Sequence, residues 1–463
     1  MFHLQIKEFL NNVCEQIKYK PIREDIAKEL ENHIEELKES YIQEGMEEKS
    51  AEEKAIKQMG EAEEIGKELN KIHKPKLDWK LLLIVGILLC FGFLVALIRV
   101  NNGLDGYVST SNIGKYLIFL GTGIVLGTII YFLDYRKLSK YSNIIYLIAT
   151  GLIVWALLYG RMVNGIPYVY ITNFISFVPT VFSMPLYIIA FVGFINDLNK
   201  ESKLQNTISK YVNIKINVNL LKVIILSIFS LIFFMLIPSM ASAGILGLTY
   251  MILGTVKILL SKTNKAKNLL RLWGSVILIG TILLTFMLGV SPFKWNRVQV
   301  TINPESDPEG AGWIAINRKE IIESAKVLGE AENKSDAIDL FDEGTDSAFI
   351  ALLAHYGWAV SITIVLTIIA LSIKLIFNAI TIKDNYGKFL IIGISSMFIL
   401  QSIFNILINL NLWIDFSLNL PFVSYGGANL IINIMSLALI LSIYRRKDII
   451  VKRNNFDEKM IKS

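Results

Sequence analysis

Asp346 is the residue of this chain best placed to do chemistry. It ends a polar loop that covers about residues 291–345, and an apolar run begins directly after it. An ionisable side chain that close to hydrocarbon is costly, which makes it a candidate functional group. The structural alternative is a helix N-cap, because an Asp oxygen in that position accepts hydrogen bonds from the free amides of the first turn. Both readings place the carboxylate at the mouth of a membrane helix.

A second candidate segment, residues 420–427, has the sequence Leu-Pro-Phe-Val-Ser-Tyr-Gly-Gly. Pro and paired Gly beside an apolar run predict non-helical backbone at membrane depth, which is tolerated where it is buried in protein or lines a cavity. Ser424 and Tyr425 can donate hydrogen bonds into such a cavity, and Gly426 and Gly427 allow close backbone approach. The alternative is a plain loop before the next span.

Polar side chains also recur inside one predicted span, where Gln401, Asn405 and Asn409 are spaced every four residues. They share one face of a helix, so they either line a polar groove or form hydrogen bonds between helices. His355, about two turns beyond Asp346, fits a packed and hydrogen-bonded residue better than a catalyst. The sequence has no phosphate-binding loop, HExxH motif or serine-triad signature.

The elements that must position these residues are membrane helices. The chain of 463 residues is 53% hydrophobic and 19% charged, whereas an average soluble domain is about 25% charged. Apolar runs long enough to cross about 30 Å of hydrocarbon recur from residue 80 onward. We predict ten spans, at about 80–100, 116–133, 142–160, 179–196, 222–238, 243–260, 272–290, 348–379, 389–411 and 427–444. The predicted fold class is an all-α polytopic membrane protein.

Lysine and arginine mark the loops expected on the cytoplasmic side. Segments 134–141, 197–222 and 261–271 are basic, as is the start of the tail, whereas loop 412–426 is not. Both termini are therefore expected in the cytoplasm and loop 291–345 outside it, which agrees with an even number of spans. The net charge of +6 reflects this topology and does not indicate nucleic-acid binding.

Three regions are predicted: a cytoplasmic helical domain over 1–78, a transmembrane domain over 79–447 and a cytoplasmic tail over 448–463. The first contains about three short helices, one of them capped by Ser50. One of its faces carries a stripe of apolar residues, Ile22, Ile26, Leu30, Ile34 and Leu37. In the outer loop, a helix on the membrane face is expected over 317–329 and another over 333–341.

These residues together resemble the SEDS family of membrane proteins (FtsW, RodA and SpoVE), over about residues 80–447. The most specific match is 420–427, which looks like the last outer-loop signature of that family. Thr345-Asp346 with the later Gly357 resembles its outer-loop-to-helix segment, and Gln401 and Asn405 stand where the family has polar residues. The start of the outer loop also matches, at Pro292, Phe293, Arg297, Pro304, Asp307, Pro308, Gly310, Gly312 and Trp313. The N-terminal part resembles permease-prefix or HAAS-type domains.

Some positions depart from the family pattern. Its arginine pair after Asn-Gly is replaced by Ile166-Pro167-Tyr168, and its Gln-Pro-Ser-Glu by Val-Pro-Thr-Val at 178–181. The acidic pair before Gly357 becomes Ala354-His355. These changes remove cations and carboxylates that bear on how a substrate is held.

The resemblance implies a glycosyltransferase that polymerises lipid II into peptidoglycan on the outer face of the cell membrane. Its implied partners are a class B penicillin-binding transpeptidase, other cell-wall synthesis proteins and membrane lipids. Asp346 matches the essential acid of the family and would act as general base. The expected substrate-binding residues are Arg297, Ser424, Tyr425, Gly426, Gly427, Gln401 and Asn405.

The leaving lipid pyrophosphate needs a cation, for which Arg297 is the candidate and a divalent metal the alternative. No cofactor is otherwise indicated, and Cys14 and Cys90 show no metal-ligand spacing. Two further hypotheses stand beside catalysis. One is a non-catalytic scaffold or regulator of wall synthesis, favoured by the missing arginines. The other is a transporter of lipid-linked precursors, for which the sequence lacks a dense line of intramembrane charge.

Overall fold

The structure is a computed structural model, and it describes residues 3–72, 76–101, 111–163, 166–170, 176–198, 218–237, 239–261, 264–274, 280–281, 298–310, 312–332 and 346–447. The chain forms two compact units, Met1–Asp78 and a membrane body that runs from Trp79 to Ile443. Predicted features at 272–290, apart from 272–274 and 280–281, at 333–341 and at Arg297 lie outside the described residues.

Among the described residues, nine helices are long and apolar enough to cross a membrane. They are α5 (Trp79–Asn101), α6 (Ser111–Phe132), α7 (Ser142–Tyr159, preceded by the 3-10 turn η2, Tyr135–Tyr141), α8 (Pro179–Asn196), α10 (Val218–Leu236), α11 (Met240–Leu260), α17 (Trp358–Thr381), α18 (Asn385–Asn409) and α19 (Gly427–Arg445). The prediction of an all-α polytopic membrane protein is confirmed. Hydrophobic length is a good guide here because bilayer thickness sets the length of a span.

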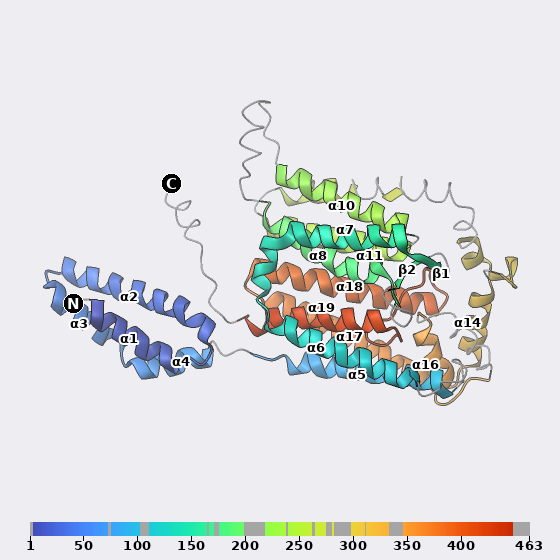
Figure 1. Cartoon of the computed structure of the whole chain (residues 1–463), viewed down its shortest axis with the longest axis horizontal. Helices are drawn as coiled ribbons and strands as arrows, with labels where there is room; N and C mark the ends of the chain where they lie inside the picture. The colour runs from blue at the N-terminus through green and yellow to red at the C-terminus, as the bar shows by residue number, and fades with distance from the viewer. Residues whose placement is uncertain are drawn as a thin grey trace, which may run out of the picture. The chain divides into compact units, whose positions relative to one another are not determined.

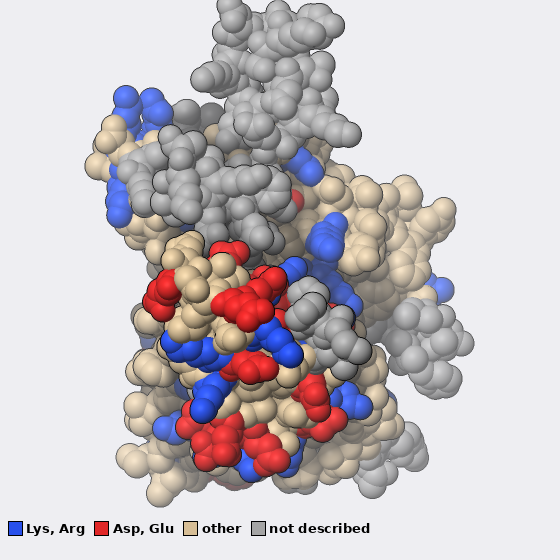
Figure 2. Space-filling view, turned by 90° about the vertical axis from the view of Figure 1, so that its left-hand side faces the viewer, with Lys and Arg blue, Asp and Glu red and all other residues tan. Residues whose placement is uncertain are grey.

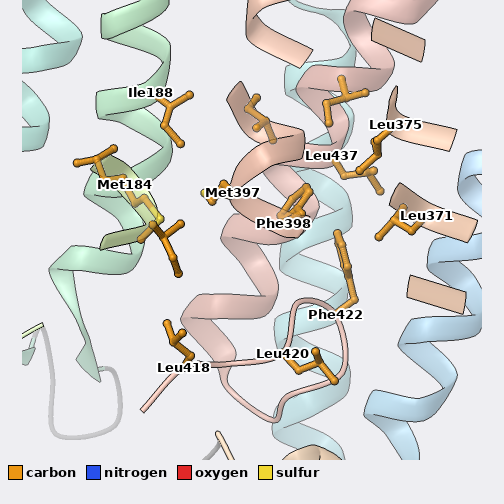
Figure 3. Packing of buried hydrophobic residues seen from close by; sticks show 14 of the residues in the cluster. Met184, Ile188, Leu371, Leu375, Met397, Phe398, Leu418, Leu420, Phe422 and Leu437 are labelled. Atoms are coloured by element: carbon orange, nitrogen blue, oxygen red, sulfur yellow. The ribbon is translucent and has the colours of Figure 1, made fainter. Parts of the chain in front are cut away.

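Helices α8 and α18 lie in the middle of the bundle and α10 at its upper edge in the view of Figure 1. In α8, 72% of the span is buried, against 17% in α6 and α10. Small residues allow the tight packing, because a Cβ on Gly393 of α18 would lie 2.6 Å from Ile188 of α8. Figure 3 shows the resulting core, in which Met184 and Ile188 of α8 face Met397 of α18. This core supports the end of the bundle that carries Asp346.

The predicted span 348–379 is wrong in one respect, because it is two helices. Helix α16 (Ala348–Tyr356) ends at Gly357, and α17 begins at the next residue. Gly357 has φ 83° and ψ −177°, a conformation open essentially to glycine alone. A Cβ there would lie 2.5 Å from the carbonyl oxygen of Lys326, which accepts a hydrogen bond from the amide of Trp358 at 2.9 Å. The segment between α14 and α16 thus supplies a missing helix acceptor at the break.

The predicted helix at 317–329 begins and ends earlier, as α14 (Trp313–Ser324). Ile321 is fully buried and packs into the membrane-body core, whereas Leu328 lies beyond the helix and is exposed. Helix α14 packs against α16. Its position is therefore set by packing against the helix that follows Asp346.

A small antiparallel sheet, which the sequence did not predict, follows α7. Strands β1 (Arg161–Val163), β2 (Ile166–Tyr170) and β3 (Ser176–Phe177) pair in that order. A Cβ on Gly160, just before β1, would lie 2.9 Å from Pro167 on β2. Strand β2 contains Ile166-Pro167-Tyr168, one of the positions that depart from the family pattern.

The N-terminal unit has four α-helices and a 3-10 turn, one α-helix more than predicted. They are α1 (His3–Gln16), η1 (Lys20–Ile22), α2 (Arg23–Gln43), α3 (Glu48–Met59) and α4 (Ala62–Ile72). Ile22, Ile26 and Ile34 of the apolar stripe are buried, and Leu30 and Leu37 pack against the same core. The predicted Ser50 cap is wrong, because α3 begins at Glu48 and has no side-chain cap.

The surface of the N-terminal unit carries both signs of charge. Figure 2 shows Asp and Glu side chains interspersed with Lys and Arg on the face it presents. Lys38 contacts Glu48 at 2.7 Å and the buried Glu52 at 3.7 Å. Mixed charge of this kind gives no strong attraction to acidic lipid headgroups.

Candidate active site

Asp346 lies in a turn directly before α16 and is partly buried. The residue at the N-cap of α16 is Ser347, which makes no side-chain capping hydrogen bond. The N-cap reading of Asp346 is therefore wrong, because the helix begins one residue too late for it. The Asp346 carboxylate therefore does not cap α16, and it lies just before the first residue of that helix.

Two asparagines of α18 hold the main chain of Asp346. The side-chain amides of Asn405 and Asn409 donate hydrogen bonds to its carbonyl oxygen at 2.9 and 3.1 Å. Asn405 also donates to the carbonyl of Leu418, in the loop between α18 and α19. Both asparagines are almost completely buried. Hydrogen bonds between helices were one of the two predicted roles of these residues; the bonds instead run from α18 to a turn and a loop, and they hold the main chain of Asp346.

A buried arginine that the sequence reasoning missed lies beside this acid. Arg318 of α14 is 3% exposed, and its Nη1 atom contacts Asp415 Oδ2 at 2.9 Å. The same atom donates to the carbonyl of Ile408 at 3.5 Å. The ion pair joins the outer-loop helix to the loop between α18 and α19. Its partners are 97 residues apart in the sequence, so no local pattern links them.

The surroundings of Asp346 favour its protonated form. Burial and, next, the nearby negative charge of Asp415 raise the pKa of the Asp346 carboxyl. Arg318 and a hydrogen bond from the Ser417 side chain act in the opposite direction. The pKa of the Tyr168 phenol on β2 is raised, first by burial and then by Tyr170 and Asp346. Tyr168 is therefore another neighbour of the acid. A carboxylate with a raised pKa is a suitable proton acceptor.

The segment 420–427 forms a turn that enters the core. Phe422 has φ 66° and lies 5.2 Å from the ring of Phe398, measured between centroids (Figure 3). Its carbonyl oxygen would lie 2.7 Å from a Cβ on Gly92 of α5. The prediction of non-helical backbone packed within protein fits this geometry.

The predicted site residues in this turn have different surroundings. The Ser424 hydroxyl oxygen accepts a hydrogen bond from the Leu420 amide at 2.7 Å, so it closes the turn. Tyr425 is partly buried and packs against the membrane-body core. A Cβ on Gly427 would lie 2.4 Å from the ring of Phe119 on α6, whereas Gly426 has more room, at 3.2 Å from Asn429. Substrate contact by these residues stays a prediction.

Gln401 makes a different contact from Asn405 and Asn409, because its side-chain amide faces the sulfur of Met184 at 3.8 Å. His355 Nδ1 lies 3.2 Å from the carbonyl of Ala351, one turn back on its own helix. Within the described ranges, no group of three or more His, Cys, Asp or Glu side chains is placed to hold a metal ion.

The chain is similar to known proteins in both sequence and structure. The family model described as "Cell cycle protein" (FtsW, RodA and SpoVE) matches residues 78–449. A probable peptidoglycan glycosyltransferase FtsW of Trichlorobacter lovleyi is 28% identical over 160 residues, which cover 34% of this chain and 42% of that protein. Stage V sporulation protein E of Bacillus subtilis is 28% identical over 174 residues, or 36% of this chain and 48% of the relative. The matched segments thus span a little under half of these relatives.

A longer match joins this chain to a probable peptidoglycan glycosyltransferase FtsW of Aliivibrio salmonicida, with 22% identity over 71% of this chain and 78% of the relative. Among solved structures, a chain of a peptidoglycan synthase complex superposes with a TM-score of 0.61 at 18% identity, over 80% of this chain and 98% of that one.

The Thermus thermophilus rod shape determining protein RodA gives a TM-score of 0.54 at 16% identity, over 80% of this chain and 97% of RodA. At these identities, the superpositions establish a shared fold. The family model adds the sequence relationship, since it matches the membrane body from its first helix to its last. This chain therefore belongs to the FtsW, RodA and SpoVE family of cell cycle proteins.

Proposed function

We propose that this protein is a membrane glycosyltransferase that extends peptidoglycan strands from lipid II. The observation that carries the proposal is Asp346, a partly buried carboxylate at the mouth of the membrane body whose main chain is held by two buried asparagines. A fixed acid with a raised pKa, next to apolar helices, suits a reaction between a sugar hydroxyl and a lipid-linked donor. The names of the relatives support the same reaction class.

In the proposed reaction, Asp346 acts as general base. The acceptor sugar hydroxyl attacks the anomeric carbon of the donor, and its proton passes to the Asp346 carboxylate. A new glycosidic C–O bond forms as the bond between the anomeric carbon and the phosphate oxygen breaks. The electron pair leaves with the lipid pyrophosphate. General-base assistance of this kind contributes about 10² to 10⁴-fold to the rate.

The developing charge on the pyrophosphate needs a cation that the substrate can reach. Arg297 is our candidate from the sequence, and a divalent metal bound together with the pyrophosphate is the alternative. Arg318 is a less suitable candidate, because its side chain is buried and already paired with Asp415. Gln401, Ser424, Tyr425, Gly426 and Gly427 would line the approach to the acid.

We place the protein in the cell membrane with both termini in the cytoplasm and Asp346 on the outer side. The bias of lysine and arginine supports this orientation. The proposed partner is a class B penicillin-binding transpeptidase, which would cross-link the new strands. Support for it comes from the related solved chain, which is part of a peptidoglycan synthase complex. Other cell-wall synthesis proteins and membrane lipids complete the proposed setting.

The deciding experiment is polymerisation of lipid II by the purified full-length protein, with and without candidate transpeptidases, compared with Asp346→Asn. Long glycan strands that a muramidase digests, made by the parent and not by the variant, are the expected result. If the parent protein binds a transpeptidase but forms no glycan with any of the candidate transpeptidases, it is a scaffold. Movement of labelled lipid II across vesicles without polymer would indicate a transporter.

A further inference from the structure

The Arg318–Asp415 pair has a second connection to the proposed base. The amide of Ser417 donates to Asp415 Oδ1 at 3.3 Å, and the carbonyl of the next residue, Leu418, accepts from Asn405, which also donates to the main-chain oxygen of Asp346. The connected groups therefore run from Arg318 through Asp415 and Ser417 to Asp346. Arg318 belongs to the outer-loop helix α14, and the other two residues belong to the loop between α18 and α19. Three separate parts of the chain are therefore linked at the turn that carries Asp346.

Burial decides what Arg318 can do in this arrangement. Its side chain is 3% exposed, and Nη1 is shared between Asp415 and the carbonyl of Ile408. A guanidinium in that position cannot reach a pyrophosphate unless the ion pair breaks. It can act on a neighbouring carboxylate through the protein interior, where charges are weakly screened. Asp415 is a third exposed and lies on the more open side of the pair.

We propose that Arg318 and Asp415 are positioning residues of the glycosyltransferase site. Their ion pair fixes α14 to the loop between α18 and α19, and in doing so fixes the orientation and charge of Asp346. The inference rests on the proposed function of Asp346 as the base. Because truncation of either partner leaves the charge of the other uncompensated, the two residues act as a unit.

The two partners have opposite electrostatic effects on the base. Arg318 and Asp415 are the charged groups that act on the Asp346 carboxyl among the described residues; the phenol of Tyr168 on β2 and the Ser417 hydroxyl are the neutral ones. Loss of Arg318 therefore makes Asp346 harder to ionise. Loss of Asp415 makes it easier, both by removing a like charge and by freeing the arginine. A role limited to folding would not produce shifts of opposite sign.

The test uses the full-length protein with Arg318→Met, Asp415→Asn and the double variant. The protonation midpoint of Asp346 is read from the infrared carboxyl band that disappears in Asp346→Asn, so the readout needs no catalysis. We expect a higher midpoint in Arg318→Met and a lower one in Asp415→Asn. The acid limb of the polymerisation rate should move in the same directions, and kcat of Arg318→Met should fall about 10- to 100-fold at neutral pH while KM changes little.

The matched control is Lys326→Met, which removes a cation of the same outer loop from an exposed pair with Glu332. It should leave the midpoint and kcat at the parent values. Arg318→Lys keeps the charge without the planar fork and should restore the midpoint better than kcat. If Arg318→Met does not fold, Arg318→Lys and Asp415→Asn still decide the matter.

Two outcomes would overturn the inference. One is a midpoint that stays at the parent value in both single variants. The other is a rise in KM with unchanged kcat in Arg318→Met, which would make Arg318 a substrate-binding cation. A third result separates the two proposals. If the parent protein forms no glycan but the infrared midpoint of Asp346 shifts as expected in the variants, the proposed function is wrong and the electrostatic coupling stands.

Discussion

The side-chain amide of Asn405 donates to the main-chain oxygen of Asp346 at 2.9 Å and also to the carbonyl of Leu418. One buried residue of α18 therefore ties together the turn that carries the acid and the loop that leads to residues 420–427. These two bonds involve the main chain and not the carboxylate of Asp346. The backbone around Asp346 is held by α18, a helix in which 56% of the span is buried.

Substitution of the acid should separate activity from stability. Asp346→Asn should reduce lipid II polymerisation by at least about 10²-fold, because the amide cannot accept the proton. Circular dichroism and the yield of monodisperse protein in detergent should match the parent. A variant that polymerises lipid II at the parent rate would exclude Asp346 as the base.

The same substitution should raise the thermal midpoint at neutral pH. The pKa of Asp346 is raised in the folded state, so the folded protein binds this proton more tightly than the unfolded chain does. Folding is then favoured at low pH, and that advantage is lost as the pH rises through the folded pKa. The gain in Asp346→Asn should therefore shrink as the pH falls towards the ordinary Asp range. An equal gain at every pH would contradict a raised pKa.

The two asparagines should differ in importance. Asn405 makes two hydrogen bonds between elements, whereas Asn409 makes one, to Asp346, and a second within its own helix, to the Asn405 carbonyl. At about 1 kcal/mol for each bond, Asn405→Ala should cost more thermal stability and more activity than Asn409→Ala. Thermal unfolding and polymerisation rates check the order. Equal losses would mean that the hydrogen bonds to Asp346 dominate and the link to Leu418 contributes little.

Much of the membrane body could be predicted from the sequence, and its breaks could not. The bounds of α8 coincide with the predicted span 179–196 because apolar length is a direct physical requirement of the bilayer. The break at Gly357 lies inside one continuous apolar run, so hydropathy does not reveal it. Its conformation is imposed by the carbonyl of Lys326, which reaches it from the outer loop.

The candidate site was accessible from sequence where a residue stands out by its surroundings. Asp346 does so as an acid beside hydrocarbon, and Asn405 does so as an amide inside a span. Arg318 does not, because an arginine on an outer-loop helix looks like any solvated cation. Only the fold buries it and places Asp415 beside it.

Replacement of Gly357 should disturb the helix that follows Asp346. Gly357→Ala places a Cβ 2.5 Å from the Lys326 oxygen in a conformation that costs about 1–3 kcal/mol even without the clash. Gly151→Ala on α7, where a Cβ meets nothing within 4 Å, is the control and should match the parent. We expect a lower thermal midpoint and a slower polymerisation rate for Gly357→Ala alone. Parent-like values for both variants would mean that the break relaxes easily.

The orientation of the membrane body can be tested by cysteine labelling in a variant without Cys14 and Cys90. Leu412 is exposed in the loop between α18 and α19, and Lys137 is exposed in η2. An impermeant thiol reagent added to intact cells should label Leu412→Cys and not Lys137→Cys, with both labelled after permeabilisation. The buried Ser424 is unsuitable for this purpose in the native protein. The reverse pattern would invert the proposed topology.

The N-terminal unit should be a separable module that controls the membrane body. Its helices enclose a core of their own, and α1 and α4 pack so closely that a Cβ on Gly66 would lie 2.7 Å from the Val13 oxygen. Gly66→Val should therefore unfold this unit, since overpacking costs about 1–3 kcal/mol and a domain of this size has little stability to lose. Glu64→Val adds the same side chain on an exposed face of α4 and should leave the unit folded.

Deletion of residues 1–74 and Gly66→Val should have the same effect. Membrane insertion and polymerisation by the purified protein should persist, while cell-wall synthesis in cells should lose its normal control. Limited proteolysis of the full-length protein checks the folding step, because only the Gly66→Val protein should be cut within the N-terminal unit. If either change also unfolds the membrane body, measured by the thermal midpoint of its tryptophan fluorescence, the N-terminal unit is a structural support and not a regulator.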